Sequence, residues 1–283
     1  MTTGVRVPGR ATGVRAELIG IGGVMERNLY LTRRYIWWEV AFFVWTVANT
    51  LTIVFIAEGI EASGGTIDVN RVTSSLLIGA VLWAYLGIIF EFLTETVAWE
   101  RWEGTIEYTF MAPLRRSAHL AGMAAWAVIY GLVRAMLLFA AVVVFFDLSM
   151  PQADFVAAIV VLLVASVSFA GIGMMTAVLP LISPEKGAQL GFVAQGLLLV
   201  VSGVYYPVDV LPTWMQWIAA ISPATYALTG VREAILDGVG LGSLVPELLV
   251  LGAIGVASVP IGILLFSAGE RYAKRHGKLK RSG

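Results

Sequence analysis

Residues 92–118, FLTETVAWERWEGTIEYTFMAPLRRSA, lie between two long apolar runs and organise the rest of the chain. One charge at the centre of a bilayer costs roughly 3 kcal/mol or more, so a segment this charged must lie in water or against another protein. Its charged side chains are Glu95, Glu100, Arg101, Glu103, Glu107, Arg115 and Arg116.

The part of this segment from about 95 to 107 reads as one amphipathic helix. The apolar side would hold Trp99, Trp102, Ile106 and Phe110, and the neighbouring side Glu100, Glu103 and Glu107. Glu103 and Glu107 would form a like-charge i,i+4 pair, which destabilises a helix by about 0.2–0.5 kcal/mol. A cationic partner surface would make these acids favourable. The alternative is a solvated helix at the membrane surface.

The composition is that of an α-helical membrane protein. The 283 residues are 58% hydrophobic and 13% charged, whereas a soluble domain is about half apolar and about a quarter charged. Several apolar runs reach about 20 residues, enough to span a bilayer as a helix, and they lack the alternation of transmembrane strands. The chain has no cysteine, which excludes disulfide scaffolds and thiol chemistry.

Hydropathy predicts an all-α polytopic protein. Its six spans are expected at 37–57, 73–93, 120–146, 155–181, 188–206 and 245–267. Residues 1–16 are rich in glycine and arginine and predict a flexible N-terminus. Residues 17–36 predict a helix lying in the membrane interface, although a solvated lead-in to the first span fits equally well. A basic tail, 268–283, follows the last span.

Lysine and arginine are concentrated on one side of this topology. Because basic loops stay in the cytoplasm, we expect both termini and the loop 94–119 to be cytoplasmic, in a cytoplasmic (inner or plasma) membrane. The predicted outer side carries only Arg71 and Arg232, and Arg134 lies within a span. The predicted cytoplasmic side carries Arg6, Arg10, Arg15, Arg27, Arg33, Arg34, Arg101, Arg115, Arg116, Lys186, Arg271, Lys274, Arg275, Lys278, Lys280 and Arg281.

The connection between the fifth and sixth spans is too apolar for a solvated loop and too interrupted for a span. Pro207, Pro212 and Pro223 each break a continuous helix. Pro212 and Pro223 would open two short helices, at about 212–221 and 224–236. Each would be about 15–20 Å long, roughly half a bilayer.

We therefore predict a re-entrant hairpin within 207–238, dipping into the outer leaflet. Irregular backbone at that depth must be buried in protein or line a cavity. The alternative is a hairpin lying on the membrane surface and anchored by Trp214 and Trp217.

No motif in the sequence indicates a catalytic site. There is no GxxxxGK[ST] phosphate loop and no HExxH or CxxC, and the histidines are His119 and His276. We therefore expect no bound metal and no catalytic residues. Three ionisable residues, Glu39, Glu91 and Arg134, lie in or at spans and are functional candidates for that reason. Either glutamate could pair with Arg134, as a helix-packing ion pair or as part of a proton relay.

Two stretches resemble the type-2 ABC transporter permeases. ERWEGTIEYTFMAPLRR (100–116) is similar to their cytoplasmic loop, with its G-T-x-E followed by a proline and basic residues. SGVYYPVDVLPTWMQWIAAISPATYALTGVREAILDG (202–238) is similar to the segment between their fifth and sixth spans. Because both stretches occur in the family's order within a six-span chain, the resemblance extends over about residues 20–270. The branch that the chain resembles most is that of daunorubicin-resistance and lipooligosaccharide exporters.

The resemblance implies a role for each part. Residues 37–267 would be a six-span transmembrane domain, two copies of which (or this chain and a close homologue) form the path, and 17–36 would be the connecting helix. Two separate P-loop ATPase subunits would bind ATP and Mg, so this chain would bind no cofactor itself. The coupling loop 94–119 would dock on the ATPase through Glu95, Glu100, Arg101, Glu103, Gly104, Thr105, Glu107, Pro113, Arg115 and Arg116. The outer face would be closed by Gly203, Pro207, Pro212, Trp214, Pro223, Tyr226 and Arg232.

The function expected from the resemblance is ATP-driven export of an amphipathic substrate: a drug, a lipid or a lipid-linked saccharide. ATP would close the ATPase dimer and move the coupling segments, and the facing first, second and fifth spans would rearrange. Trp45, Trp83 and Tyr85 are candidate substrate contacts, although they could equally face lipid or the core. We expect contact with membrane lipid and none with nucleic acid. The alternative function is an ion-coupled secondary transporter that uses Glu39, Glu91 and Arg134.

Overall fold

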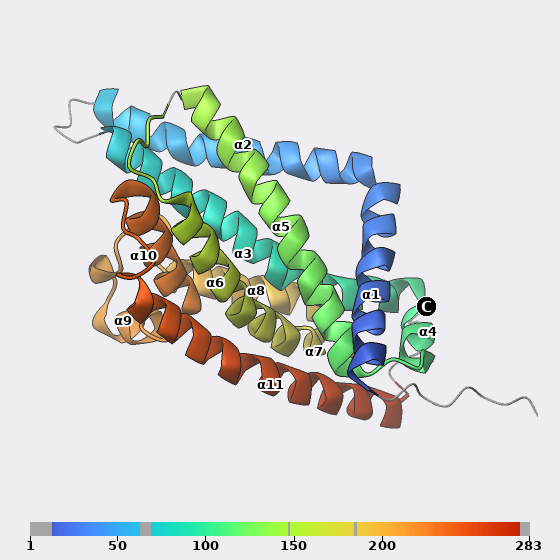
Figure 1. Ribbon diagram of the computed structural model, residues 1–283. Helices are drawn as coiled ribbons and strands as arrows, with labels where there is room; N and C mark the ends of the chain where they lie inside the picture. Colours follow the sequence, from blue (N-terminus) through green and yellow to red (C-terminus); the bar gives the residue numbers. More distant parts are fainter. Residues whose placement is uncertain (1–12, 63–68, 147, 184–185, 278–283) are drawn as a thin grey trace, which may run out of the picture.

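The computed structural model describes residues 13–62, 69–146, 148–183 and 186–277, and every regular element in them is helical (Figure 1). The elements are α1 Val14–Arg34, α2 Ile36–Ala62, α3 Val69–Glu103, α4 Ile106–Met111, α5 Arg116–Phe146, α6 Phe155–Thr176, α7 Val178–Ile182, α8 Gly187–Val201, the 3-10 helix η1 Val208–Val210, α9 Thr213–Ala219, α10 Pro223–Leu236 and α11 Val245–Arg275.

The described residues contain five helices that are long and apolar enough to cross a membrane, which makes this a multi-pass membrane protein. They are Ile36–Ile56, Asn70–Glu103, Arg116–Phe146, Phe155–Ile182 and Val245–Arg275. Ile36–Ile56 matches the predicted first span to within one residue at each end, and the other four contain the predicted second, third, fourth and sixth spans. The helix that contains the fourth joins α6 and α7 at Ala177. The last extends beyond the predicted end at 267, so the start of the basic tail is helical.

The predicted fifth span, 188–206, is the least regular. Helix α8 covers Gly187–Val201 and has 15 residues, fewer than a bilayer requires. It ends because Ser202 turns its hydroxyl back to the Leu198 carbonyl and Gly203 takes a φ of 70°. A glycine in this left-handed conformation is a common way to stop a helix.

Small residues let the central helices approach closely. An added Cβ at Gly171 of α6 would overlap the Ser258 side chain of α11, and one at Gly262 would lie 2.7 Å from the Gly171 carbonyl oxygen. Helices in lipid associate largely through such close van der Waals packing. Large side chains fill the space around this contact, and Tyr85, Phe90, Phe169 and Phe266 are fully buried.

Ion pairs and hydrogen bonds define two ends of the bundle. At one end, Arg115 pairs with Glu17 and Arg116 with Glu270, which joins the starts of α1 and α5 to the end of α11. We call this the α4 end. At the other, the α10 end, the Asp154 amide donates to the Ala234 carbonyl at 2.9 Å. Helix α1 lies at the α4 end and runs across the direction of α2 (Figure 1), as the predicted interfacial helix would.

Candidate functional site

The charged segment is not one helix. Helix α3 continues out of the predicted second span to Glu103 and then stops at Gly104, whose φ is 78°. The Thr105 amide donates to the Glu100 carbonyl at 2.8 Å and closes the turn, and α4 begins at Ile106. The prediction of a continuous helix over 95–107 is therefore wrong, because glycine allows the left-handed conformation that ends α3.

This break changes which side chains share a face. Trp99 and Trp102 are exposed and touch edge to face with ring centroids 5.3 Å apart, whereas Ile106 and Phe110 are buried in the core. The prediction that all four lie on one side is wrong. Glu103 and Glu107 lie on either side of the break, so they are not a helical i,i+4 pair, and both are exposed.

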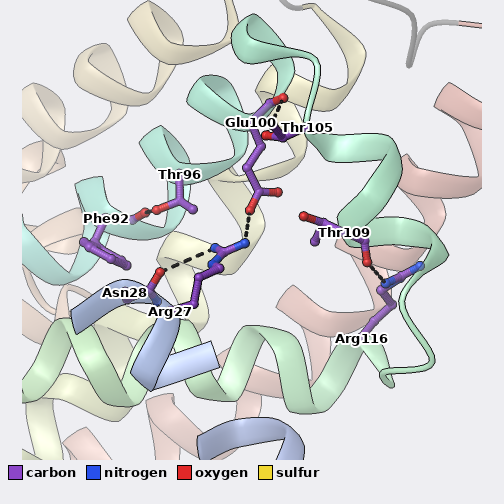
Figure 2. A network of polar contacts seen from close by, with 8 residues as sticks. All are labelled: Arg27, Asn28, Phe92, Thr96, Glu100, Thr105, Thr109 and Arg116. Carbon is purple, nitrogen blue, oxygen red and sulfur yellow. Dashed lines mark hydrogen bonds and ion pairs between the residues drawn. The ribbon is translucent and has the colours of Figure 1, made fainter. Parts of the chain in front are cut away.

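Glu100 points into the protein and not toward a partner. Its carboxylate accepts a hydrogen bond of 2.5 Å from Arg27 Nη1 of α1 (Figure 2), and the residue is 8% exposed. The expectation that Glu100 shares an outward acidic face with Glu103 and Glu107 is wrong. Burial of this carboxylate is tolerated because Arg27 supplies the opposite charge.

Arg101 is also used within the chain. It is buried, and its Nη1 donates to the carbonyls of Leu181 at 2.6 Å and Pro180 at 3.2 Å. These carbonyls belong to the last turn of α7, where a helix leaves carbonyl groups without intrahelical partners. Arg101 therefore fixes the end of α3 to α7, ahead of the turn into α8.

Arg116 holds α4 onto the bundle. It donates to Glu270 at 2.8 Å and to the Phe110 carbonyl at 2.7 Å, and its guanidinium lies 4.6 Å from the Phe110 ring centroid; its contact with Thr109 is drawn in Figure 2. Glu270 also accepts from Lys274 at 2.6 Å. Sequence reasoning did not identify Arg27 or Glu270, since each lies far along the chain from its partner.

What remains outward is an aromatic and acidic patch. We call it the α4 surface: Trp99, Trp102, Glu103, Glu107, Tyr108 and Met111, all exposed. Trp102 is 72% and Tyr108 74% exposed. Tyr108 and Met111 were not predicted, although helical periodicity alone turns them away from the buried Ile106 and Phe110. Of the other predicted coupling residues, Thr105 and Pro113 are exposed in turns and Glu95 is half-buried on α3.

Arg134 pairs with Glu39 and not with Glu91. Its Nη1 lies 3.6 Å from Glu39 Oε2, and Tyr130 bridges them by donating to Glu39 while accepting from Arg134 at 2.9 Å. This contact joins α2 to α5. Glu91 is half-buried on α3.

The aromatic residues proposed as substrate contacts have different environments. Trp45 is exposed on α2 and Trp83 is half-buried on α3. Tyr85 is fully buried, and its hydroxyl lies 2.5 Å from that of Ser166 in α6. In this conformation Tyr85 is a core residue, Trp45 is accessible from outside and Trp83 is partly accessible.

At the α10 end, the two short helices predicted from the prolines are present. Pro223 occupies the first turn of α10, and Pro212 directly precedes α9. Trp214 and Pro207 are exposed, and Tyr226 donates to the Ala220 carbonyl at 2.7 Å, which closes the turn between the helices. Helix α10 buries one side within the bundle, whereas α9 buries only Ala219.

The described residues contain no group of three or more acidic, histidine or cysteine side chains placed to hold a metal ion. The α4 surface is suited to binding: its exposed aromatic rings supply contact area, and the carboxylates of Glu103 and Glu107 supply negative charge.

Comparison with known proteins gives a consistent result. Residues 28–236 match the family described as ABC-2 type transporter. The "ABC transporter G family member 20" of Dictyostelium discoideum is 34% identical over 85 residues, covering 30% of this chain and 12% of that protein. The "Linearmycin resistance permease protein LnrN" of Bacillus subtilis (strain 168) is 37% identical over 68 residues, covering 24% of this chain and 17% of that protein. The matched stretches thus span less than a fifth of either relative.

Proposed function

Because the chain belongs to the ABC-2 type transporter family, we propose that it is the membrane-spanning permease subunit of an ATP-driven exporter powered by separate P-loop ATPase subunits. The observation that carries this proposal is the α4 surface. Most of the charged groups nearby are used inside the protein, yet Glu103, Glu107 and their aromatic neighbours remain outward. Exposed aromatic groups ringed by charge are typical of a protein–protein contact.

The α4 surface is built to transmit movement. It lies at the end of α3, a helix of 35 residues and therefore about 50 Å long. Arg101 ties this end to α7, Glu100 ties it to α1, and Arg116 ties α4 to α5 and α11. A force applied to the α4 surface would thus reach several spans together. We propose that closure of the ATPase dimer supplies this force and alternately exposes the path.

We further propose that the α4 end is cytoplasmic. Described basic residues cluster there, among them Arg27, Arg115, Arg116, Lys274 and Arg275, whereas Arg71 and Arg232 lie at the α10 end. This asymmetry is that of cytoplasmic and outer membrane faces. ATP and Mg would bind to the partner, and two copies of this chain, or this chain and a homologue, would form the path.

For the substrate we propose an amphipathic molecule: a drug, a lipid or a lipid-linked saccharide. The name of the Bacillus relative, a linearmycin resistance permease, supports export of such a compound. The ion-coupled alternative has less support, because Glu39 and Arg134 satisfy each other through Tyr130, as a packing contact between two helices would.

Charge reversal on the α4 surface tests this proposal. We expect Glu103→Lys/Glu107→Lys to weaken binding of the ATPase by about tenfold or more, since two favourable surface contacts become repulsive. The measurement is recovery of a P-loop ATPase, identified by mass spectrometry, with the tagged permease. Glu26→Lys, at an exposed glutamate on α1, is the matched control. Equal recovery of the ATPase with the unaltered permease, the double variant and the Glu26→Lys control would overturn the assignment of the docking surface.

A further inference from the structure

Arg232 on α10 binds backbone carbonyls from two other elements. Its Nη2 donates to Val204 at 2.8 Å and to Ser75 at 3.3 Å, and its Nη1 donates to Gly203 at 3.3 Å. Gly203 and Val204 directly follow α8, and Ser75 lies near the start of α3. Among the described residues, no carboxylate forms an ion pair with Arg232. Its guanidinium thus binds two carbonyls of the turn that follows α8 and one carbonyl in the second turn of α3.

The surroundings of this contact are closely packed. An added Cβ at Gly79 of α3 would overlap the Val204 carbonyl oxygen and lie 3.2 Å from Arg232 Nη2. At the start of α10, the hydroxyls of Ser222 and of Ser202, the residue after α8, lie 2.9 Å apart, and both residues are buried. The end of α8 therefore meets α10 at its start, through Ser222, and again near its end, through Arg232.

Helix α10 is also held on its other side. The Asp154 amide donates to the Ala234 carbonyl at 2.9 Å, and Gly230 lies so close to Val161 of α6 that an added Cβ would be 3.2 Å from it. Helix α9 differs, since Trp214 and Trp217 are exposed, as is Ile221 just beyond its end. The two short helices that the sequence presents as a pair thus have opposite environments.

Separating α10 from α8 would be costly in a membrane. Arg232 and the carbonyls of Gly203 and Val204 would lose their hydrogen bonds at a buried site, where unpaired polar groups are costly, whereas apolar surfaces can part and be covered by lipid. We infer that α10 is a fixed part of the wall, locked by Arg232 to the ends of α3 and α8, and that the substrate path opens outside this unit. This inference rests on the proposed transport function and makes Arg232 a positioning residue.

A cysteine pair tests whether the unit moves. The chain contains no cysteine, so Ser202→Cys/Ser222→Cys can be cross-linked without background. The pair is oxidised in the reconstituted complex with its ATPase, both at rest and after trapping with ATP and vanadate. We expect equal cross-linking in both states and an unchanged rate of ATP hydrolysis after cross-linking. Cross-linking confined to the resting state, or a loss of hydrolysis that reduction restores, would overturn the inference.

A second measurement tests Arg232 itself. In a Ser222→Cys protein we expect protection from a membrane-impermeant maleimide applied from outside, and we expect Arg232→Met to remove that protection while Arg232→Lys retains part of it. Thr213→Cys, at an exposed position at the start of α9, is the labelling control. If the Ser222→Cys thiol were equally protected from the maleimide with Arg232 and with Arg232→Met, Arg232 would not hold α10 in place. If Arg232→Met does not insert, the cysteine pair still decides whether the unit is fixed.

These outcomes separate the two proposals. Failure to recover an ATPase would overturn the proposed function and this inference with it. Recovery of the ATPase together with state-dependent cross-linking would overturn the inference alone.

Discussion

Arg27→Gln should destabilise the attachment of α1 to α3, because it leaves the Glu100 carboxylate buried without its cation. The Glu100 side chain is 10% exposed and lies 2.5 Å from Arg27 Nη1. Removing one partner of a fully buried pair costs about 3–5 kcal/mol. Because the Arg27 side chain is itself 36% exposed, water weakens the interaction, and we expect a loss of about 2 kcal/mol.

The assay is a double-mutant cycle with Arg27→Gln, Glu100→Gln and the double variant, each unfolded reversibly in mixed micelles. The double variant should lose less unfolding free energy than the sum of the losses in the two single variants, since it buries no unpaired charge. Glu17 and Arg115 form the control pair, which joins α1 to the start of α5, and their side chains are 36% and 67% exposed. We expect a coupling of about 0–1 kcal/mol between these two residues. A coupling between Arg27 and Glu100 no larger than that of the control would refute the reasoning.

Other substitutions test further contacts by the same unfolding measurement. Gly122→Ala should cost about 1–3 kcal/mol, because the new Cβ would lie 2.9 Å from the Ile21 carbonyl oxygen of α1; Gly252→Ala, with no atom within 4 Å, should be neutral or stabilise by up to about 1 kcal/mol, and equal effects would contradict this packing. Glu270→Gln should cost about 2–4 kcal/mol, since Arg116 and Lys274 both lose their acid; a change within error would show that the α4 end is held by other contacts. Tyr130→Phe should cost about 1–2 kcal/mol, because Glu39 and Arg134 lose the hydroxyl that bridges them; no effect would remove it from the α2–α5 contact.

Much of the helical framework could be predicted from the sequence, because long apolar runs and prolines act locally. The apolar runs located the first, second, third, fourth and sixth spans, and Pro223 located the start of α10. Helix ends were harder to place. The sequence put the end of the second span near Leu93, whereas α3 continues to Glu103, because Arg27 and the carbonyls of α7 neutralise or bind the charges that would otherwise require water.

The sequence singled out the segment that forms the α4 surface, but not which of its side chains face outward. The break at Gly104 separates the exposed Trp99 and Trp102 of α3 from the buried Ile106 and Phe110 of α4. Periodicity assumes an unbroken helix and cannot register such a break. The partners of Glu100 and Arg116 are 73 and 154 residues away along the chain, so no local pattern could have identified them.

The fixed position of α10 was also beyond sequence reasoning. Its prolines and its length suggested a hairpin with α9 in the outer leaflet, and nothing local distinguishes the two helices. The distinction comes from distant contacts. Arg232 binds α3 and the turn after α8, Gly230 packs against α6, and Gly79 packs against that turn and Arg232. Packing between distant elements therefore decides which short helix is part of the wall.

The central claim is that the α4 surface docks on an ATPase, and site-specific photocross-linking in cells tests it most directly. A photoreactive phenylalanine analogue replaces Trp102 or Tyr108 at the α4 end, and Trp217, equally exposed on α9, is the control position. We expect a cross-linked P-loop ATPase from positions 102 and 108 and none from position 217. No ATPase at the α4 end, or the same ATPase at position 217, would contradict it.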